Sequence, residues 1–206
     1  MASSEVVHVI DDDADVRQSL AFLLSTAGIA VRVHESAIAF LQALPTIEGG
    51  CIVTDVRMPG MDGIALQRRL KADKSSIPVI VMTGHGDIAL AVEAMKAGAV
   101  DFIEKPFDDD ALIGAIKTAL SRGRESSERR SAASVVRDRL KLLSDRERQV
   151  LDGLVAGKPN KIIAYDLGIS PRTVEIYRAN VMTKMQADSL SALVRMALLA
   201  RGDDLR

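Results

Sequence analysis

Residues 6–34 read VVHVIDDDADVRQSLAFLLSTAGIAVRVH, and this stretch decides the fold of the first half of the chain. A β-branched apolar run is followed by an amphipathic stretch and then by a second β-branched run, which predicts a strand, a helix and a strand. The alternation continues outward to residue 122, where the runs CIVT, VIVMT and DFIE are separated by further helical stretches. Five strands in strict alternation with five helices predict an α/β domain with a (βα)5, doubly wound parallel sheet.

The last third of the chain carries helix signals only. Ser144 and Glu147 make a capping-box pattern, and Asn160 stands where it can cap the next, shorter helix. Ser170 and Pro171 open a longer helix with an N-cap residue and a proline at the first helical position. A fourth helix follows, so we expect a small all-α domain with a helix-turn-helix at its centre.

These patterns divide the chain into a first domain over residues 1–122, a charged segment over 123–139 and a helical domain over 140–206. Helix formers dominate the charged segment, and only Gly123 interrupts them. This composition favours a semi-rigid helical continuation of the preceding helix over a flexible tether, and both forms of linker stay open at this point.

Charge is distributed unevenly along a chain whose formal net charge is only -1. Residues 1–122 hold 11 Lys and Arg against 17 Asp and Glu, whereas residues 123–206 hold 16 against 11. The basic second half is suited to a polyanion such as nucleic acid. No apolar run approaches the ~20 residues of a membrane span, so we expect a cytoplasmic protein that meets no membrane. Cys51 is expected to be a small buried thiol.

Acidic side chains follow the first and third predicted strands. Asp11, Asp12 and Asp13 come directly after VVHVI, and Asp55 ends the run CIVTD. Because the carboxyl ends of parallel strands share one edge of the sheet, these carboxylates meet there, and such a cluster of oxygen ligands suits Mg²⁺. Lys105 follows the fifth strand at the same edge. Carboxylates, a divalent cation and a lysine make a site for a phosphoryl group.

The alternative interpretation is that the aspartates are only helix caps and turn residues, and for Asp13 that role is sufficient. Thr83, at the end of VIVMT, brings a hydroxyl to the same edge. The three histidines, His8, His34 and His85, fall on different predicted elements without metal-ligand spacing, and we expect no catalytic role for them.

Four motifs lie in order at the predicted strand ends. They are DDD at 11–13, TDVRMPGMDG at 54–63, VMTGHGD at 81–87 and DFIEKPF at 101–107. Together they resemble the receiver domain of bacterial two-component response regulators, over essentially all of residues 5–122. The resemblance implies a flavodoxin-like fold and a phosphoryl group that Asp55 accepts from a sensor histidine kinase.

The same resemblance implies roles for the neighbouring residues. Asp12 and Asp55, with the backbone carbonyl of Arg57, hold Mg²⁺, and Asp11 helps through water. Lys105 pairs with the new phosphate, and the Lys105–Pro106 peptide bond is cis. The signal ends by autodephosphorylation, so the protein is no enzyme beyond a weak autophosphatase. A true aspartyl phosphohydrolase would need a second acidic residue where Arg57 stands.

The switch implied by the receiver family consists of Thr83, which turns its hydroxyl toward the phosphate, and Phe102, a mobile aromatic side chain. An ordinary core role for Phe102 is the alternative. The helix and strand in DIALAVEAMKAG and DFIEKPF are then expected to form the face that changes shape.

The helix RTVEIYRANVMTKM has one apolar face, made by Val174, Tyr177, Val181 and Met185. The residues expected to read base edges lie on the opposite face, namely Arg172, Glu175, Ile176 and Ala179. Those expected to contact phosphates are Lys161, Thr173, Arg178, Asn180 and Lys184. For Lys161 and Lys184 a merely solvated position remains an equal alternative.

Residues 140–202 resemble the LuxR-type or NarL-type DNA-binding domain, through LSDRERQVLDGLVAGKPNKIIAYDLGISPRTVEIYRANVMTKM and the later LVRMALLA. The resemblance implies that the longer helix enters the major groove and that the last helix pairs two copies. Several family members carry a basic residue where this chain has Glu175 or Ala179, which leaves the operator open.

Both halves together resemble the FixJ-type branch of response regulators. This resemblance implies a regulator that dimerises when phosphorylated, binds promoter DNA and activates transcription by RNA polymerase. The resemblance also implies that the regulated genes are those of nitrogen fixation under low oxygen and that the kinase is a haem-based oxygen sensor. A sister regulator with another input, or a DNA-binding protein independent of phosphorylation, is the alternative.

Overall fold

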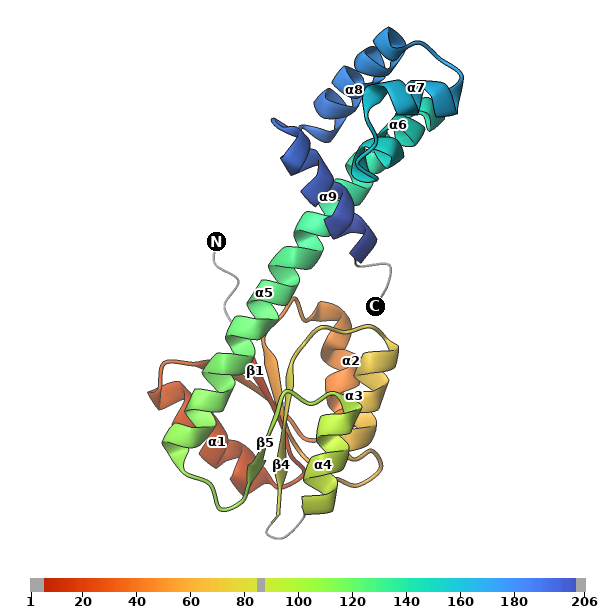
Figure 1. The fold of residues 1–206 in the computed structure, drawn as a ribbon. Coiled ribbons are helices and arrows are strands. Elements are labelled where there is room, and N and C mark those ends of the chain that lie inside the picture. Colours follow the sequence, from red (N-terminus) through yellow and green to blue (C-terminus); the bar gives the residue numbers. More distant parts are fainter. Residues whose placement is uncertain (1–5, 85–87, 203–206) are drawn as a thin grey trace. The chain divides into compact units, whose positions relative to one another are not determined.

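The structure, a computed structural model, describes residues 6–84 and 88–202 of the 206-residue chain. The chain forms two compact units that divide between Ser127 and Glu128. Figure 1 shows the helices and strands of both units.

The first unit is built on a parallel sheet, as predicted. In the described residues its five strands lie in the order β2-β1-β3-β4-β5. The strands are β1 (Val6–Ile10), β2 (Ala30–His34), β3 (Cys51–Asp55), β4 (Val79–Thr83) and β5 (Asp101–Glu104). The helices between them are α1 (Ala14–Thr26), α2 (Ala37–Ala43), α3 (Gly63–Ala72) and α4 (Ile88–Ala97), with a short 3-10 turn at Leu44–Thr46. The doubly wound, flavodoxin-like prediction is therefore confirmed.

Two hydrophobic layers hold the sheet. Alternate strand residues such as Val9 and Val53 face α1 and α5, whereas Ile10 and Ile52 face α2, α3 and α4. This alternation follows from the two-residue period of a strand, and burial on both faces explains the continuous apolar runs in the sequence. Cys51 is buried in the first of these layers, as expected.

Helix α5 (Asp109–Lys141) is the longest helix of the described chain and runs through the charged segment 123–139 without a break. Gly123 packs closely within the first unit, because a Cβ atom there would come within 3.1 Å of Pro78 Cδ and 3.2 Å of the Gly50 carbonyl oxygen. A larger residue would have to displace one of these neighbours, so glycine serves close packing at a position where helix propensity disfavours it.

The second unit contains α6 (Asp145–Val155), α7 (Asn160–Leu167), α8 (Pro171–Met185) and α9 (Leu190–Gly202). Ser144 and Glu147 form the predicted capping box, and Ser170 caps α8 ahead of Pro171. The predicted cap at Asn160 is wrong. Asn160 is already the first helical residue, and Pro159 takes the N-cap position, where it offers its carbonyl but no side-chain acceptor.

The core of the second unit confirms the predicted apolar face of α8. Val174, Val181 and Met185 are fully buried, and Tyr177 packs at the margin of the same cluster. None of the helices in the described ranges is long and apolar enough to cross a membrane.

Candidate functional site

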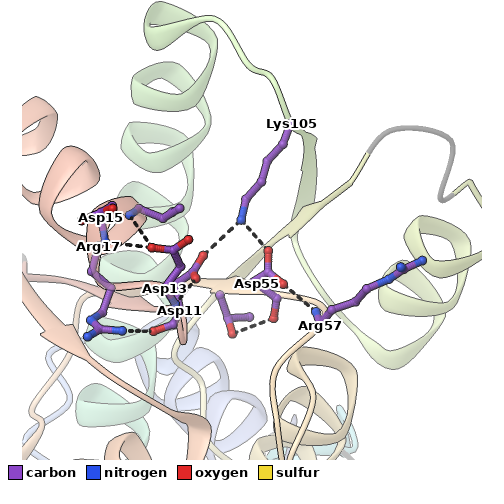
Figure 2. A network of polar contacts seen from close by, with 9 residues as sticks. Asp11, Asp13, Asp15, Arg17, Asp55, Arg57 and Lys105 are labelled. Carbon is purple, nitrogen blue, oxygen red and sulfur yellow. Dashed lines mark hydrogen bonds and ion pairs between the residues drawn. The ribbon is translucent and has the colours of Figure 1, made fainter.

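Two of the four aspartates predicted to meet at one sheet edge, Asp11 and Asp55, do so around a lysine. Lys105 Nζ lies 2.5 Å from Asp55 Oδ1 and 3.1 Å from Asp11 Oδ2 (Figure 2). Asp55 ends β3, Asp11 follows β1, and Lys105 follows β5, so three separate strand ends supply the three charges. The Asp11 side chain is only 3 % exposed and that of Asp55 13 %.

The second oxygen of each carboxylate is held by the backbone of its own loop. Arg57 N donates to Asp55 Oδ2 at 2.6 Å, and Asp13 N donates to Asp11 Oδ1 at 2.9 Å. The two carboxylates therefore have the same arrangement, with one oxygen fixed by a backbone N–H and the other turned toward Lys105 (Figure 2).

Electrostatics favour the charged form of Lys105. Burial alone lowers the pKa of Lys105, but the hydrogen bonds and charges of Asp55 and Asp11 outweigh burial and hold this pKa above its ordinary value. Two carboxylates share one ammonium, so the cluster keeps an excess of negative charge. Such an excess attracts a further cation.

The other two aspartates of the DDD motif lie at the surface. Asp13 caps α1, accepting from Asp15 N at 2.8 Å and from Val16 N at 3.4 Å, so its predicted structural role is confirmed. Asp12 is exposed. Within residues 6–84 and 88–202, no three His, Cys, Asp or Glu side chains converge in a way that could hold a metal by themselves.

Thr83 and Phe102, the expected switch residues, lie on neighbouring strands. Thr83 is 3 % exposed, and its carbonyl accepts from Lys105 N at 2.8 Å, which ties the end of β4 to the lysine. Phe102 is 44 % exposed, so the alternative of a core aromatic is wrong. It lines a groove with Val92 and Met95 of α4. The Lys105–Pro106 peptide bond is cis, which confirms that expectation.

Two of the histidines that the sequence leaves unconnected touch each other. His8 Nδ1 lies 3.1 Å from His34 Nε2, and both rings pack edge-on against Phe40. Burial, followed by the charges of His34 and Arg32, lowers the pKa of His8 to about 4. Burial followed by the Arg32 charge lowers the pKa of His34 as well. Their shared face follows from the β1–β2 register, which pairs Ile10 with His34. His85 lies outside the described residues.

A second feature that sequence reasoning missed is an apolar groove beside the acidic cluster. Phe22 and Leu23 of α1 line it together with Phe107, and Lys105 belongs to its wall. Phe22 is 73 % exposed, and with the other lining side chains it makes an exposed apolar patch. The sequence signal is Phe22 itself, because it falls off the buried face of α1 that Leu20 and Leu24 mark.

The predicted base-reading residues share one solvent-facing side of α8. Arg172, Glu175, Ile176 and Ala179 are all exposed, and Ile176 is exposed to 57 % although it is apolar. An isoleucine held in water on a regular helix is suited to contact with another surface.

The residues predicted to contact phosphates divide into two groups. Lys161 and Asn180 are exposed, while Thr173 and Arg178 are half-buried at the margin of α8. Lys184 has a different partner: its Nζ atom lies 2.7 Å from Glu147 Oε2 and donates to the Leu142 carbonyl at 3.3 Å.

Comparison with known proteins agrees with this geometry. Residues 7–117 match the family model of the response regulator receiver domain, and residues 141–197 match that of the bacterial regulatory proteins of the luxR family. The chain is 62 % identical over 200 residues to the transcriptional regulatory protein FixJ of Azorhizobium caulinodans, a match covering 97 % of this chain and 95 % of that protein.

Two solved structures are similar over nearly the whole chain. The crystal structure of full-length FixJ from B. japonicum shares 54 % identity at a TM-score of 0.60, covering 98 % of this chain and 99 % of that one. The structure of the response regulator StyR shares 42 % identity at a TM-score of 0.79, covering 93 % and 97 %.

Proposed function

The chain belongs to the FixJ-like response regulators, which join a receiver domain to a LuxR-type DNA-binding domain, and we propose that phosphorylation of Asp55 controls its binding to promoter DNA. The observation that carries the proposal is the position of Lys105 Nζ between the carboxylates of Asp55 and Asp11. A site that already holds an ammonium beside a carboxylate is arranged for the charge that a phosphoryl group adds.

The phosphoryl group comes from a phosphohistidine of a sensor kinase. An oxygen of Asp55 forms a bond to phosphorus while the P–N bond breaks, its electrons return to the imidazole, and the ring leaves neutral after taking a proton from solvent. Lys105 then exchanges its contact with Asp55 Oδ1 for one with the more highly charged phosphate. Asp11 stays within reach of the ammonium and keeps it at the strand ends.

The donor set of the cluster fits Mg²⁺. Mg²⁺ keeps several waters and is usually held by one or two carboxylates, and Asp55 and Asp11 supply carboxylate oxygens at one sheet edge. Asp12, Asp55 and the Arg57 carbonyl would hold it, with Asp11 acting through water. When bound there, Mg²⁺ would supply positive charge against the transferring phosphoryl group. Water later hydrolyses the acyl phosphate, and this slow reaction is the only catalytic activity that we assign to the protein.

The groove beside α1 is the surface that we assign to the kinase. Lys105 belongs both to the groove and to the acidic cluster, so a partner seated against Phe22 has its phosphohistidine next to Asp55. An exposed aromatic side chain at the edge of an apolar groove is the usual anchor of a protein interface.

The groove between α4 and β5 is the surface that we assign to a second copy of the chain. Ile88, Val92, Met95 and Phe102 are all large apolar residues that are 44 % or more exposed there. The new phosphate draws the Thr83 hydroxyl inward and Phe102 follows, so phosphorylation favours the dimerising form of this face.

DNA binding belongs to α8, whose exposed side offers Arg172 and Glu175 as hydrogen-bonding groups for base edges. Lys161, Thr173, Arg178 and Asn180 contact phosphates and carry the salt dependence of binding. The similarity to the FixJ proteins supports a transcription activator that acts on nitrogen-fixation genes through RNA polymerase. Its kinase is then a haem-based sensor of oxygen, and kinase, regulator and DNA meet in the cytoplasm.

The decisive experiment compares wild type with Asp55→Asn, each with and without acetyl phosphate and Mg²⁺. Glu48→Gln is the matched control, because Glu48 is an exposed acidic residue of the same unit. We expect wild type and the control to dimerise and to bind a promoter fragment more tightly after treatment, and Asp55→Asn to do neither. An unchanged response in Asp55→Asn refutes the proposal and favours DNA binding that is independent of phosphorylation.

A further inference from the structure

The C-terminal end of α8 is held by the last turn of α5. Helix α8 ends at Met185, and Gln186 leaves it in the left-handed region at a φ of 52°. Arg139 Nη1 donates to the Met185 carbonyl at 3.0 Å, and Arg139 Nη2 donates to Gln186 Oε1 at 2.6 Å. A guanidinium at this position satisfies a carbonyl that the helix leaves open and complements the negative end of its dipole.

A second tie joins the same end of α8 to the start of α6. Lys184 Nζ lies 2.7 Å from Glu147 Oε2, and it also donates to the Leu142 carbonyl at 3.3 Å. Glu147 is 4 % exposed, and its Oε2 atom accepts a further bond of 2.8 Å from Ser144 N. The carboxylate is therefore fixed to the backbone at the start of α6 and holds Lys184 from there.

The charge balance of this pair bears on DNA binding. A carboxylate as buried as that of Glu147 needs a partner, and Lys184 is its cationic partner in the structure. If Lys184 turned to a DNA phosphate, Glu147 would keep its bond from Ser144 N but would lose its cationic partner while remaining buried. As a pair, the two side chains offer a polyanion no net charge.

From these contacts we infer that Arg139, Glu147 and Lys184 form a clamp that sets the position of α8 for DNA, and that Lys184 does not bind phosphate. All three are positioning residues, and none of them touches the DNA. The inference rests on the proposed role of α8 as the helix that meets DNA. It adds that the last turn of α5 determines where the end of this helix lies.

The test measures the affinity of the full chain for a short fluorescent duplex, chosen as the sequence that wild type enriches most from a random library. The variants are Lys184→Met, Glu147→Gln and Arg139→Met, with Arg178→Met as the phosphate-contact control and Arg172→Ala as the base-contact control. Affinity is measured over a series of salt concentrations. Urea unfolding first establishes a temperature at which every variant is fully folded, so that lost stability cannot imitate lost affinity.

The clamp predicts a loss of affinity in all three variants, of about 2- to 30-fold, the usual range for positions that act on a binding site from outside it. It also predicts an unchanged salt slope, whereas Arg178→Met reduces the slope by about 0.9 because one phosphate contact is lost. Glu147→Gln best distinguishes a positioning role from a simple effect of charge. Removing an acidic group near DNA ordinarily strengthens binding, so weaker binding here supports a positioning role.

Two results overturn the inference. In the first, the salt slope of Lys184→Met falls as it does in Arg178→Met, and Glu147→Gln binds DNA as well as wild type or better. This result would make Lys184 a phosphate ligand. The second is wild-type affinity in all three clamp variants while the two control variants lose affinity. If the controls also bind as wild type does, α8 is not the DNA-binding helix, and the proposed function fails together with the clamp.

Discussion

Lys105 Nζ lies 2.5 Å from Asp55 Oδ1, so the residue assigned to accept phosphate is already paired with a cation. The lysine reaches over from the end of β5 and is 28 % exposed. Because Asp11 shares it, the ammonium compensates only one of two negative charges. The phosphoryl group, Mg²⁺ and Lys105 therefore each change the net charge of the same carboxylate cluster.

Replacing Lys105 by Met should tighten Mg²⁺ binding. The substitution removes a positive charge next to the carboxylates, and we expect roughly a tenfold gain in affinity, which corresponds to about 1.4 kcal/mol of repulsion relieved in a site screened by solvent. Isothermal titration calorimetry with MgCl₂ measures the change. Lys117→Met, an exposed lysine of α5, is the control that should bind as wild type does. Equal or weaker Mg²⁺ binding in Lys105→Met would mean that the ion binds away from this lysine.

Phe22→Ser should slow phosphotransfer from the kinase and leave the reaction with acetyl phosphate unchanged. The small donor needs no docking surface, whereas an aromatic anchor at an interface contributes about tenfold or more to binding. Phosphotransfer from a labelled kinase, measured at several concentrations of the regulator, separates a higher KM from a lower kcat. Ile38→Ser removes an exposed apolar side chain of α2 and serves as the control. A parallel loss with both phosphate donors would place the defect at Asp55 itself.

Val92→Asp should prevent dimerisation after treatment with acetyl phosphate without preventing phosphorylation of Asp55. An aspartate in the α4–β5 groove brings like charges together across a symmetric interface and desolvates them. Light scattering gives the assembly state, and a gel that retards phosphoproteins gives the extent of modification. Ile38→Asp carries the same change elsewhere on the unit. A dimer that survives Val92→Asp would rule out this groove as the interface.

His8→Leu should reduce the loss of stability on acidification. The pKa of His8 is about 4 in the folded chain against 6.5 for an unperturbed histidine, so the unfolded chain binds more protons between these values. The stabilisation by neutral His8 is complete above pH 6.5 and is lost as the pH falls toward 4. Between pH 7 and pH 5 this amounts to about 2 kcal/mol.

Urea unfolding at pH 7 and pH 5 measures the change in the free energy of unfolding of wild type and of His8→Leu. Subtracting one change from the other removes the contribution of the carboxylates that both proteins share. We expect the free energy of unfolding to fall more on acidification in wild type than in His8→Leu. Equal losses in the two proteins would show that His8 is protonated in the folded chain at pH 5.

The acidic site could be predicted from sequence because topology brings it together. Asp11, Asp55 and Lys105 each follow a strand, and the carboxyl ends of parallel strands share an edge wherever the individual side chains point. The order of strands and helices could likewise be predicted from two periodicities of apolar residues, of two residues in the strands and about 3.6 in the helices. These patterns are local, so the sequence by itself determined the order of elements, the two layers of the first unit and the buried face of α8.

Tertiary structure decided which partner each side chain contacts, because local sequence patterns do not distinguish between the possible partners. Lys184 lies on the flank of α8, where helical periodicity cannot tell a cation that meets DNA from one that meets Glu147, 37 residues earlier. His8 and His34 touch only because β1 and β2 pair in one particular register. Periodicity assigns a residue to a face, but the partner on that face depends on which element packs there. Only the folded chain, with its long-range contacts made, specifies that choice.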